Sequence, residues 1–132
     1  MNTIVVETAG WIRADIEAES VEVRMTYDPA DPLAVSLRVA GLGRDEFWVF
    51  ARDLLADGLR SLVPVGNGDI HVQATSVLTE ISRRTEDGLW ETLRLPWWNT
   101  REFIRLSHVE VPRGQEACDV DAWVEAITAP GH

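Results

Sequence analysis

The stretch WVFARDLLADGL, Trp48 to Leu59, decides the fold of this chain. Side chains alternate between the two faces of a strand, so Phe47 and Val49 are expected on one face and Trp48 and Phe50 on the other. Both faces of this strand are therefore large and apolar. This predicts that the strand is covered on both sides within the chain, or that a partner covers one side.

The second half of the stretch predicts a helix. Residues 51–59 have apolar side chains at helical spacing, Gly58 is placed to end the helix, and Asp53 suits the positive end of its dipole. Arg52 and Asp53 point in different directions from consecutive positions, so each is expected to bond backbone or another loop. The junction has no nucleophile, histidine or oxyanion glycines, so we interpret it as a structural corner and not as an active site.

Further strands are predicted on both sides of this corner. Short β-rich or alternating segments between turn residues are typical of strands. They are Thr3–Val6, a ladder through Trp11, Ile16, Val21, Val23 and Met25, then Ala34–Ala40, Glu46–Phe50, Ile70–Ala74, Val77–Thr85 and Leu89–Leu95. The last two flank Glu86-Asp87-Gly88, which is a hairpin signal.

Two more helices are predicted towards the C-terminus. Asn99 is placed to cap a helix with Glu102 as its third residue, a variant of the capping box. Asp119–Ile127 has apolar residues at i, i+3, i+4 and i+7. Six or seven strands and three helices give an α+β fold with a mainly antiparallel sheet, in a single domain over residues 1–132.

Composition limits the classes of function. The formal net charge is −10, and all twelve basic residues are arginine, spread along the chain. Phosphate binding needs a concentrated basic face, so the charge disfavours nucleic acid. No apolar run reaches the ~20 residues of a membrane span. The N-terminus lacks the basic residues of a secretory signal, and Cys118 is the only cysteine, so a cytoplasmic protein is predicted.

Candidate catalytic and ligating residues do not cluster. His71, His108 and His132 have no partner at ligand spacing, so neither a metal nor a cofactor is predicted. Asp28 and Asp31 could form an acid/base pair, but each precedes a proline in an exposed turn, where an Asx-type turn is favoured.

Tryptophans and arginines offer an alternative function. Exposed aromatic rings stack the bases of single strands, and the candidate surface consists of Arg83, Arg84, Trp97, Trp98 and Arg101. Tryptophans beside a helix start are more typical of core or subunit contacts. Single-stranded nucleic-acid binding therefore remains the alternative.

Three segments resemble the SsgA/SsgB-like family of actinobacterial proteins that control sporulation-specific cell division. They are YDPADPLAV (27–35), FWVFARDLLADGL (47–59) and GNGDIHV (66–72), and the resemblance continues more loosely through residues 103–106 and 111–116. It covers nearly the whole chain.

The resemblance implies a fold and a function. It implies a trimeric, strongly curved antiparallel sheet of the "whirly" single-strand-binding architecture, acting through protein contacts and not as an enzyme. The implied role is an adaptor that localises the tubulin-like protein FtsZ and promotes its assembly at septal sites, or a paralogue acting in spore maturation. A family paralogue or membrane-associated division protein is the other implied partner; neither nucleic acid nor membrane insertion is expected.

An oligomer or partner interface is the hypothesis for the central stretch. The two-sided apolar strand suggests a subunit interface, as a trimer would need. The residues expected there are Phe47, Trp48, Phe50, Arg52, Asp53, Leu54 and Leu55.

Overall fold

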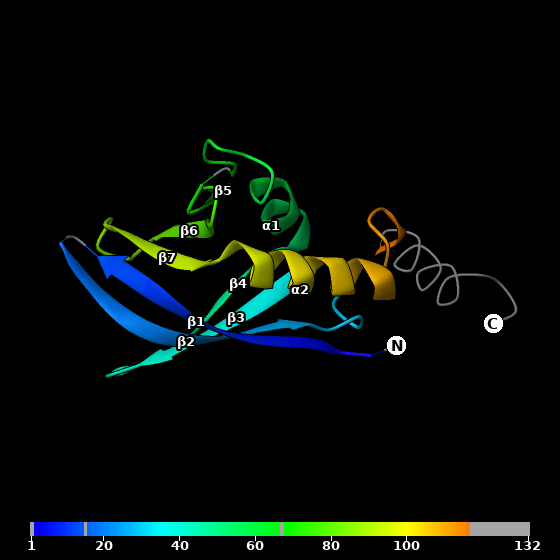
Figure 1. Cartoon of the computed structure of the whole chain (residues 1–132), viewed down its shortest axis with the longest axis horizontal. Helices are drawn as coiled ribbons and strands as arrows, with labels where there is room; N and C mark the ends of the chain where they lie inside the picture. The colour runs from blue at the N-terminus through cyan, green and yellow to red at the C-terminus, as the bar shows by residue number, and fades with distance from the viewer. Residues whose placement is uncertain (1, 15, 67, 117–132) are drawn as a thin grey trace, which may run out of the picture.

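A seven-stranded antiparallel sheet with two helices forms the described part of the chain, residues 2–14, 16–66 and 68–116 of a computed structural model (Figure 1). The strand order is β4-β3-β2-β1-β7-β6-β5. The elements are β1 (Ile4–Ala14), β2 (Glu17–Tyr27), β3 (Ala34–Gly41), β4 (Arg44–Ala51), α1 (Arg52–Gly58), β5 (Ile70–Ala74), β6 (Leu78–Arg84), β7 (Trp90–Pro96) and α2 (Trp97–Glu110). Neither α1 nor α2 is long and apolar enough to cross a membrane.

The α+β fold with an antiparallel sheet is confirmed, and most predicted strands are found within a few residues of their expected bounds. The strand predicted at Thr3–Val6 is much longer, because β1 pairs with β2 continuously from Ile4–Tyr27 to Ala14–Glu17. The hairpin predicted at Gly88 is confirmed, with that glycine at φ 81°. The predicted helix Asp119–Ile127 lies outside the described residues.

The sheet curls so that its two ends approach each other. Glu46 on β4 contacts Arg83 on β6 at 2.8 Å, although four strands separate β4 and β6 in the sheet order. The core fills the concave side, where Met25, Leu37 and Leu93 are fully buried. The helix α2 packs on β1, β6 and β7, and α1 packs on β5 and β4. Both helices therefore help to close the curled sheet, which has the form of a half-barrel.

The helix α2 begins at Trp97 and not at Asn99, so the predicted cap is wrong. The strand β7 runs directly into the helix through Pro96, with no side-chain cap. The Trp97 backbone N–H donates to Val77 O at 2.9 Å, and its indole Nε1 donates to Leu59 O at 3.0 Å. These bonds fix the helix start against Val77, just before β6, and Leu59, just after α1, while Asn99 donates to Thr8 instead.

Gly58 ends α1, as predicted, but for a packing reason. A Cβ at Gly58 would lie 2.3 Å from Cγ1 and 2.4 Å from Cβ of Val72 on β5. Its backbone is not among the glycines with positive φ. The missing side chain therefore lets α1 approach β5 closely.

Gly58→Ala is expected to lower the free energy of unfolding by about 1–3 kcal/mol, because the added methyl group overpacks against Val72. Urea unfolding would measure the change. The control is Arg60→Ala, an exposed position two residues on, expected to stay within about 0.5 kcal/mol of the parent. An unchanged Gly58→Ala protein would contradict the close approach of α1 and β5.

Candidate functional site

Arg52 is the centre of the corner between β4 and α1, and it is fully buried. Its Nη1 donates to Ser107 O at 3.0 Å and to Val111 O at 2.7 Å, both at the C-terminal end of α2. Its Nη2 forms an ion pair with the buried carboxylate of Glu116. The guanidinium also lies 4.6 Å from the centre of the Tyr27 ring. One side chain thus ties together β2, α1 and the segment after α2.

The position of Arg52 suits the electrostatics of α2. A helix carries partial negative charge at its C-terminus, where a cation is favourable. Arg52 supplies that cation from another element, since α2 has only His108 as a basic residue in its last turn. A buried arginine also needs several acceptors to offset the loss of hydration. The prediction that Arg52 bonds backbone or another loop is confirmed.

Glu116 completes this buried pair. Burial raises the pKa of its carboxyl, but the hydrogen bonds from Arg52 and from the Gly114 backbone outweigh burial and leave the pKa below its ordinary value. The carboxylate is therefore ionised when the protein is folded at neutral pH. No local pattern in the sequence connects residues 52 and 116; only the demand of a buried arginine for an anion signals such a partner.

Asp53 points away from Arg52 to the surface side of the same corner. Its Oδ1 lies 3.3 Å from Nε of Arg113, and Arg113 Nη1 lies 2.7 Å from Asp57 Oδ1. This second link again joins α1 to the segment after α2. This link is half-exposed, so its contribution to the stability of the fold is smaller than that of the Arg52–Glu116 pair.

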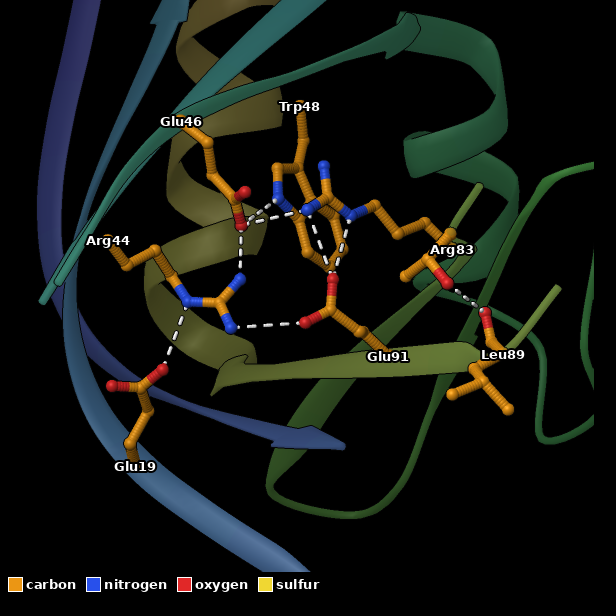
Figure 2. A network of polar contacts seen from close by, with 8 residues as sticks. Glu19, Arg44, Glu46, Trp48, Arg83, Leu89 and Glu91 are labelled. Carbon is orange, nitrogen blue, oxygen red and sulfur yellow. Dashed lines mark hydrogen bonds and ion pairs between the residues drawn. The ribbon is translucent and has the colours of Figure 1, made fainter. Parts of the chain in front are cut away.

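A second polar network closes the seam between the two ends of the sheet (Figure 2). Arg44 on β4 contacts Glu46, Glu19 on β2 and Glu91 on β7. Arg83 on β6 contacts Glu46 and Glu91 and lies 4.2 Å from the centre of the Trp48 ring. The Trp48 indole Nε1 donates to Glu46 at 3.2 Å.

The charged form of each group in this network is stabilised by the opposite charges around it. Burial raises the pKa of Glu46, but hydrogen bonds from Arg44 and Arg83 outweigh it and leave the pKa below its ordinary value. Burial lowers the pKa of Arg44, and its three carboxylate partners more than reverse that effect. Arg44 and Glu46 therefore both stay charged at neutral pH, and their ion pairs hold the two ends of the sheet together.

The residues of the hypothesised interface fall into two groups. Four are buried within the chain itself: Trp48, Phe50, Arg52 and Leu55. Asp53 and Leu54 are half-buried, whereas Phe47 is 63% exposed and its neighbour Val49 is 60% exposed. The Trp48 face of β4 is thus core, and a surface that meets a partner has to be built from the Phe47 face.

The alternative aromatic and basic surface is divided by the structure. Trp97, Trp98 and Arg101 lie together at the start of α2, with Arg101 5.4 Å from the centre of the Trp98 ring. Arg83 pairs with Glu91 near the start of β7, and the six residues from there to Trp97 span about 20 Å of strand. Arg83 and Arg84 therefore do not join the tryptophans in one face.

The candidate ligating residues remain separate in the described chain. His71 stacks on Trp90 with ring centres 5.0 Å apart, and His108 lies on α2. Burial, then Arg52 and Arg113, lower the pKa of His108, so it is neutral at pH 7. The Ala30 backbone N–H donates to Asp28 Oδ1 at 2.9 Å, which confirms the predicted Asx turn. His132 and Cys118 lie outside the described residues, among which no three His, Cys, Asp or Glu gather as a metal site.

Comparison with protein families identifies the chain. The family model described as "Streptomyces sporulation and cell division protein, SsgA" matches residues 21–116, which hold the corner and all of the polar seam except Glu19. The chain belongs to the SsgA family. The resemblance proposed from its sequence segments is therefore confirmed.

Relatives and solved structures agree with this membership. The chain is 33% identical over 116 residues to a sporulation-specific cell division protein of Frankia casuarinae, covering 84% of this chain and 77% of the relative. It is 43% identical over 115 residues to SsgB of Streptomyces coelicolor, covering 80% of each.

A solved structure of SsgB from Streptomyces coelicolor matches with a TM-score of 0.72 at 29% identity, covering 87% of this chain and 94% of that one. It was described with mutations that correlate to longitudinal cell division during sporulation. An SsgA-like sporulation-specific cell division protein from Thermobifida fusca matches with a TM-score of 0.80 at 22% identity over 96% of both chains, a likeness of fold.

Arg52→Met is expected to lower the free energy of unfolding by about 3–5 kcal/mol, because it leaves the Glu116 carboxylate buried without its cation. Arg105→Met is the matched control: its pair with Glu102 is half-exposed, so a change below about 1 kcal/mol is expected. Denaturant unfolding of both variants measures the difference. Equal effects would show that the corner does not depend on Arg52.

Stability is expected to fall in acid through Glu116. Because its folded pKa is depressed, its contribution is fully present above the unfolded pKa and is lost as pH falls through the folded pKa. Urea midpoints measured between neutral pH and pH about 3 should therefore decline less steeply for Glu116→Gln than for the parent. The two curves converging in acid would support this account, whereas parallel curves would contradict it.

Proposed function

We propose that this SsgA-family protein is a non-enzymatic, homo-oligomeric adaptor in sporulation-specific cell division. The observation that carries the proposal is the family match together with relatives named as sporulation-specific cell division proteins. The corner at Arg52 supports a scaffold role, because the buried charges of Arg52 and Glu116 are used in contacts within the protein.

Self-association is proposed to use the outer face of β4. This strand is at the edge of the sheet, and Phe47 and Val49 are both exposed on it. Neighbouring apolar side chains exposed on one face give a partner area to cover. The trimer and the whirly-like architecture that the resemblance implies are part of this proposal.

The partner proposed for the oligomer is FtsZ, which the resemblance implies, with a family paralogue or a membrane-associated division protein as the second contact. The protein would then be recruited from the cytoplasm to division septa. A role in spore maturation is the variant of this proposal that needs a different partner.

Single-stranded nucleic-acid binding is the second candidate, supported by Arg101 beside Trp97 and Trp98. It has less support, because Arg83 is neutralised by Glu46 and Glu91 and the chain carries a net charge of −10. Steep loss of binding with rising salt would be its signature.

Replacing Phe47 and Val49 together by serine is expected to reduce the mass of the oligomer to that of one chain, without unfolding, because both side chains are exposed. Light scattering behind a sizing column measures the mass. Val109→Ser, equally exposed on α2, is the control and should keep the oligomer. Trp48→Ser is uninformative here, since removing a core tryptophan costs about 3–5 kcal/mol and threatens folding. An oligomer unaffected by the double change would reject this interface.

Purified FtsZ added in a second run separates the two parts of the proposal. Co-elution of the oligomer with FtsZ supports the division adaptor. An oligomer that leaves the elution of FtsZ unchanged argues against FtsZ as the direct partner and moves the function to another division protein or to spore maturation.

A further inference from the structure

A groove of about 540 Å³ lies between α1 and α2, outside the polar seam and sharing Arg113 with the surface side of the corner. Its apolar lining includes Leu59 from the end of α1 and Trp97 and Ile104 from α2. Leu59 and Ile104 are nearly buried and form a firm floor, while Trp97 is held by its hydrogen bond to Leu59 O. Both walls therefore belong to fixed elements, so the groove is preformed.

The groove is basic in an acidic protein. Four of the twelve arginines of the chain line it, and no carboxylate does: Arg60, Arg101, Arg105 and Arg113. Two are neutralised from outside the groove, Arg105 by Glu102 and Arg113 by Asp53 and Asp57. Within the described part of the chain, Arg60 and Arg101 form no ion pair. They leave positive charge on both walls, which is only partly offset from outside the groove by Asp57 near Arg60 and Glu102 near Arg101.

An exposed apolar strip follows α2 beside these charges. Trp98 is 68% exposed and Val109 is 67% exposed, and they lie on the same side of the helix as Arg101 and Arg105, at spacings of three or four residues. The guanidinium of Arg101 lies 5.7 Å from the Trp97 ring centre and 5.4 Å from that of Trp98. Large apolar groups next to an arginine without an ion pair, here Arg101, are typical of protein-binding surfaces.

We propose that the α1–α2 groove binds an acidic, amphipathic segment of a partner protein. Apolar side chains of that segment would cover Trp97, Trp98 and Ile104, and its carboxylates would meet Arg60 and Arg101. A helix laid in a groove presents both kinds of group at i, i+3, i+4 and i+7. The inference stands apart from the identity of the partner, and so from FtsZ.

Charge favours a peptide over a nucleic acid as the occupant. A single strand brings a phosphate with every nucleotide into the field of a chain with net charge −10, and only two arginines here are free to meet it. A peptide with a few carboxylates matches those two arginines without the excess charge.

Fluorescence anisotropy with three labelled probes tests the inference on the full chain. The first is a synthetic amphipathic peptide of about four helical turns, with leucine and tryptophan on one face and glutamate on the other. The second replaces each glutamate by lysine, and the third is oligo-deoxythymidine. The test variant is Arg60→Glu with Arg101→Glu. The control is Arg24→Glu with Arg84→Glu, exposed arginines outside the groove with the same total change in charge.

The parent chain and the control are expected to bind the glutamate peptide, and the test variant is expected to bind it about tenfold more weakly or worse. Circular dichroism and thermal unfolding confirm that both variants fold. Three results would overturn the inference: no binding of the glutamate peptide, equal weakening by test and control variants, or equal binding of the lysine peptide. Tight binding of oligo-deoxythymidine that the test variant abolishes would assign the groove to nucleic acid instead. If the chain binds the glutamate peptide but not FtsZ, this inference stands and only FtsZ is rejected as the partner.

Discussion

The buried guanidinium of Arg52 is the constraint on which the arrangement of the helices depends. A buried arginine needs acceptors to offset the loss of hydration, and here both Nη atoms have them while Nε does not. Here those acceptors are Ser107 O, Val111 O and the Glu116 carboxylate, 55 to 64 residues further along the chain. The requirement fixes the end of α2 against α1. The α1–α2 groove inherits its shape from this tie, because its two walls are the helices that Arg52 joins.

The curl of the sheet rests on a different device. An open sheet of seven strands twists, but nothing in its ladder makes β4 approach β6. The Arg44, Glu46, Arg83 and Glu91 network supplies that contact, with Trp48 packed beneath Arg83. Because the seam is lined by charged groups, the sheet closes there without an apolar edge to which further strands could add.

Much of the fold can be predicted from the sequence, because alternation and turn residues are local signals. The strand β5, the Gly88 hairpin and the corner at Arg52 follow from residues close to one another. The partners of Arg52 do not, since no local pattern joins residues 52 and 116. The strand at Trp48 shows a second limit. Its two apolar faces look alike in sequence, and only the curl decides that Trp48 is core and Phe47 is exposed.

The distribution of arginines separates the scaffold from the surface. Arg44, Arg52 and Arg83 are spent on internal carboxylates, so a count of basic residues in the sequence overstates the charge that a partner can meet. What matters for recognition is the charge that remains after internal pairing, and at the α1–α2 groove it remains on Arg60 and Arg101. Their neighbours in the groove are apolar and the rest of the chain is acidic. A negatively charged partner is therefore attracted only at the groove and repelled elsewhere on the surface. Such a surface selects a partner that carries a short acidic segment and disfavours one that is negatively charged throughout.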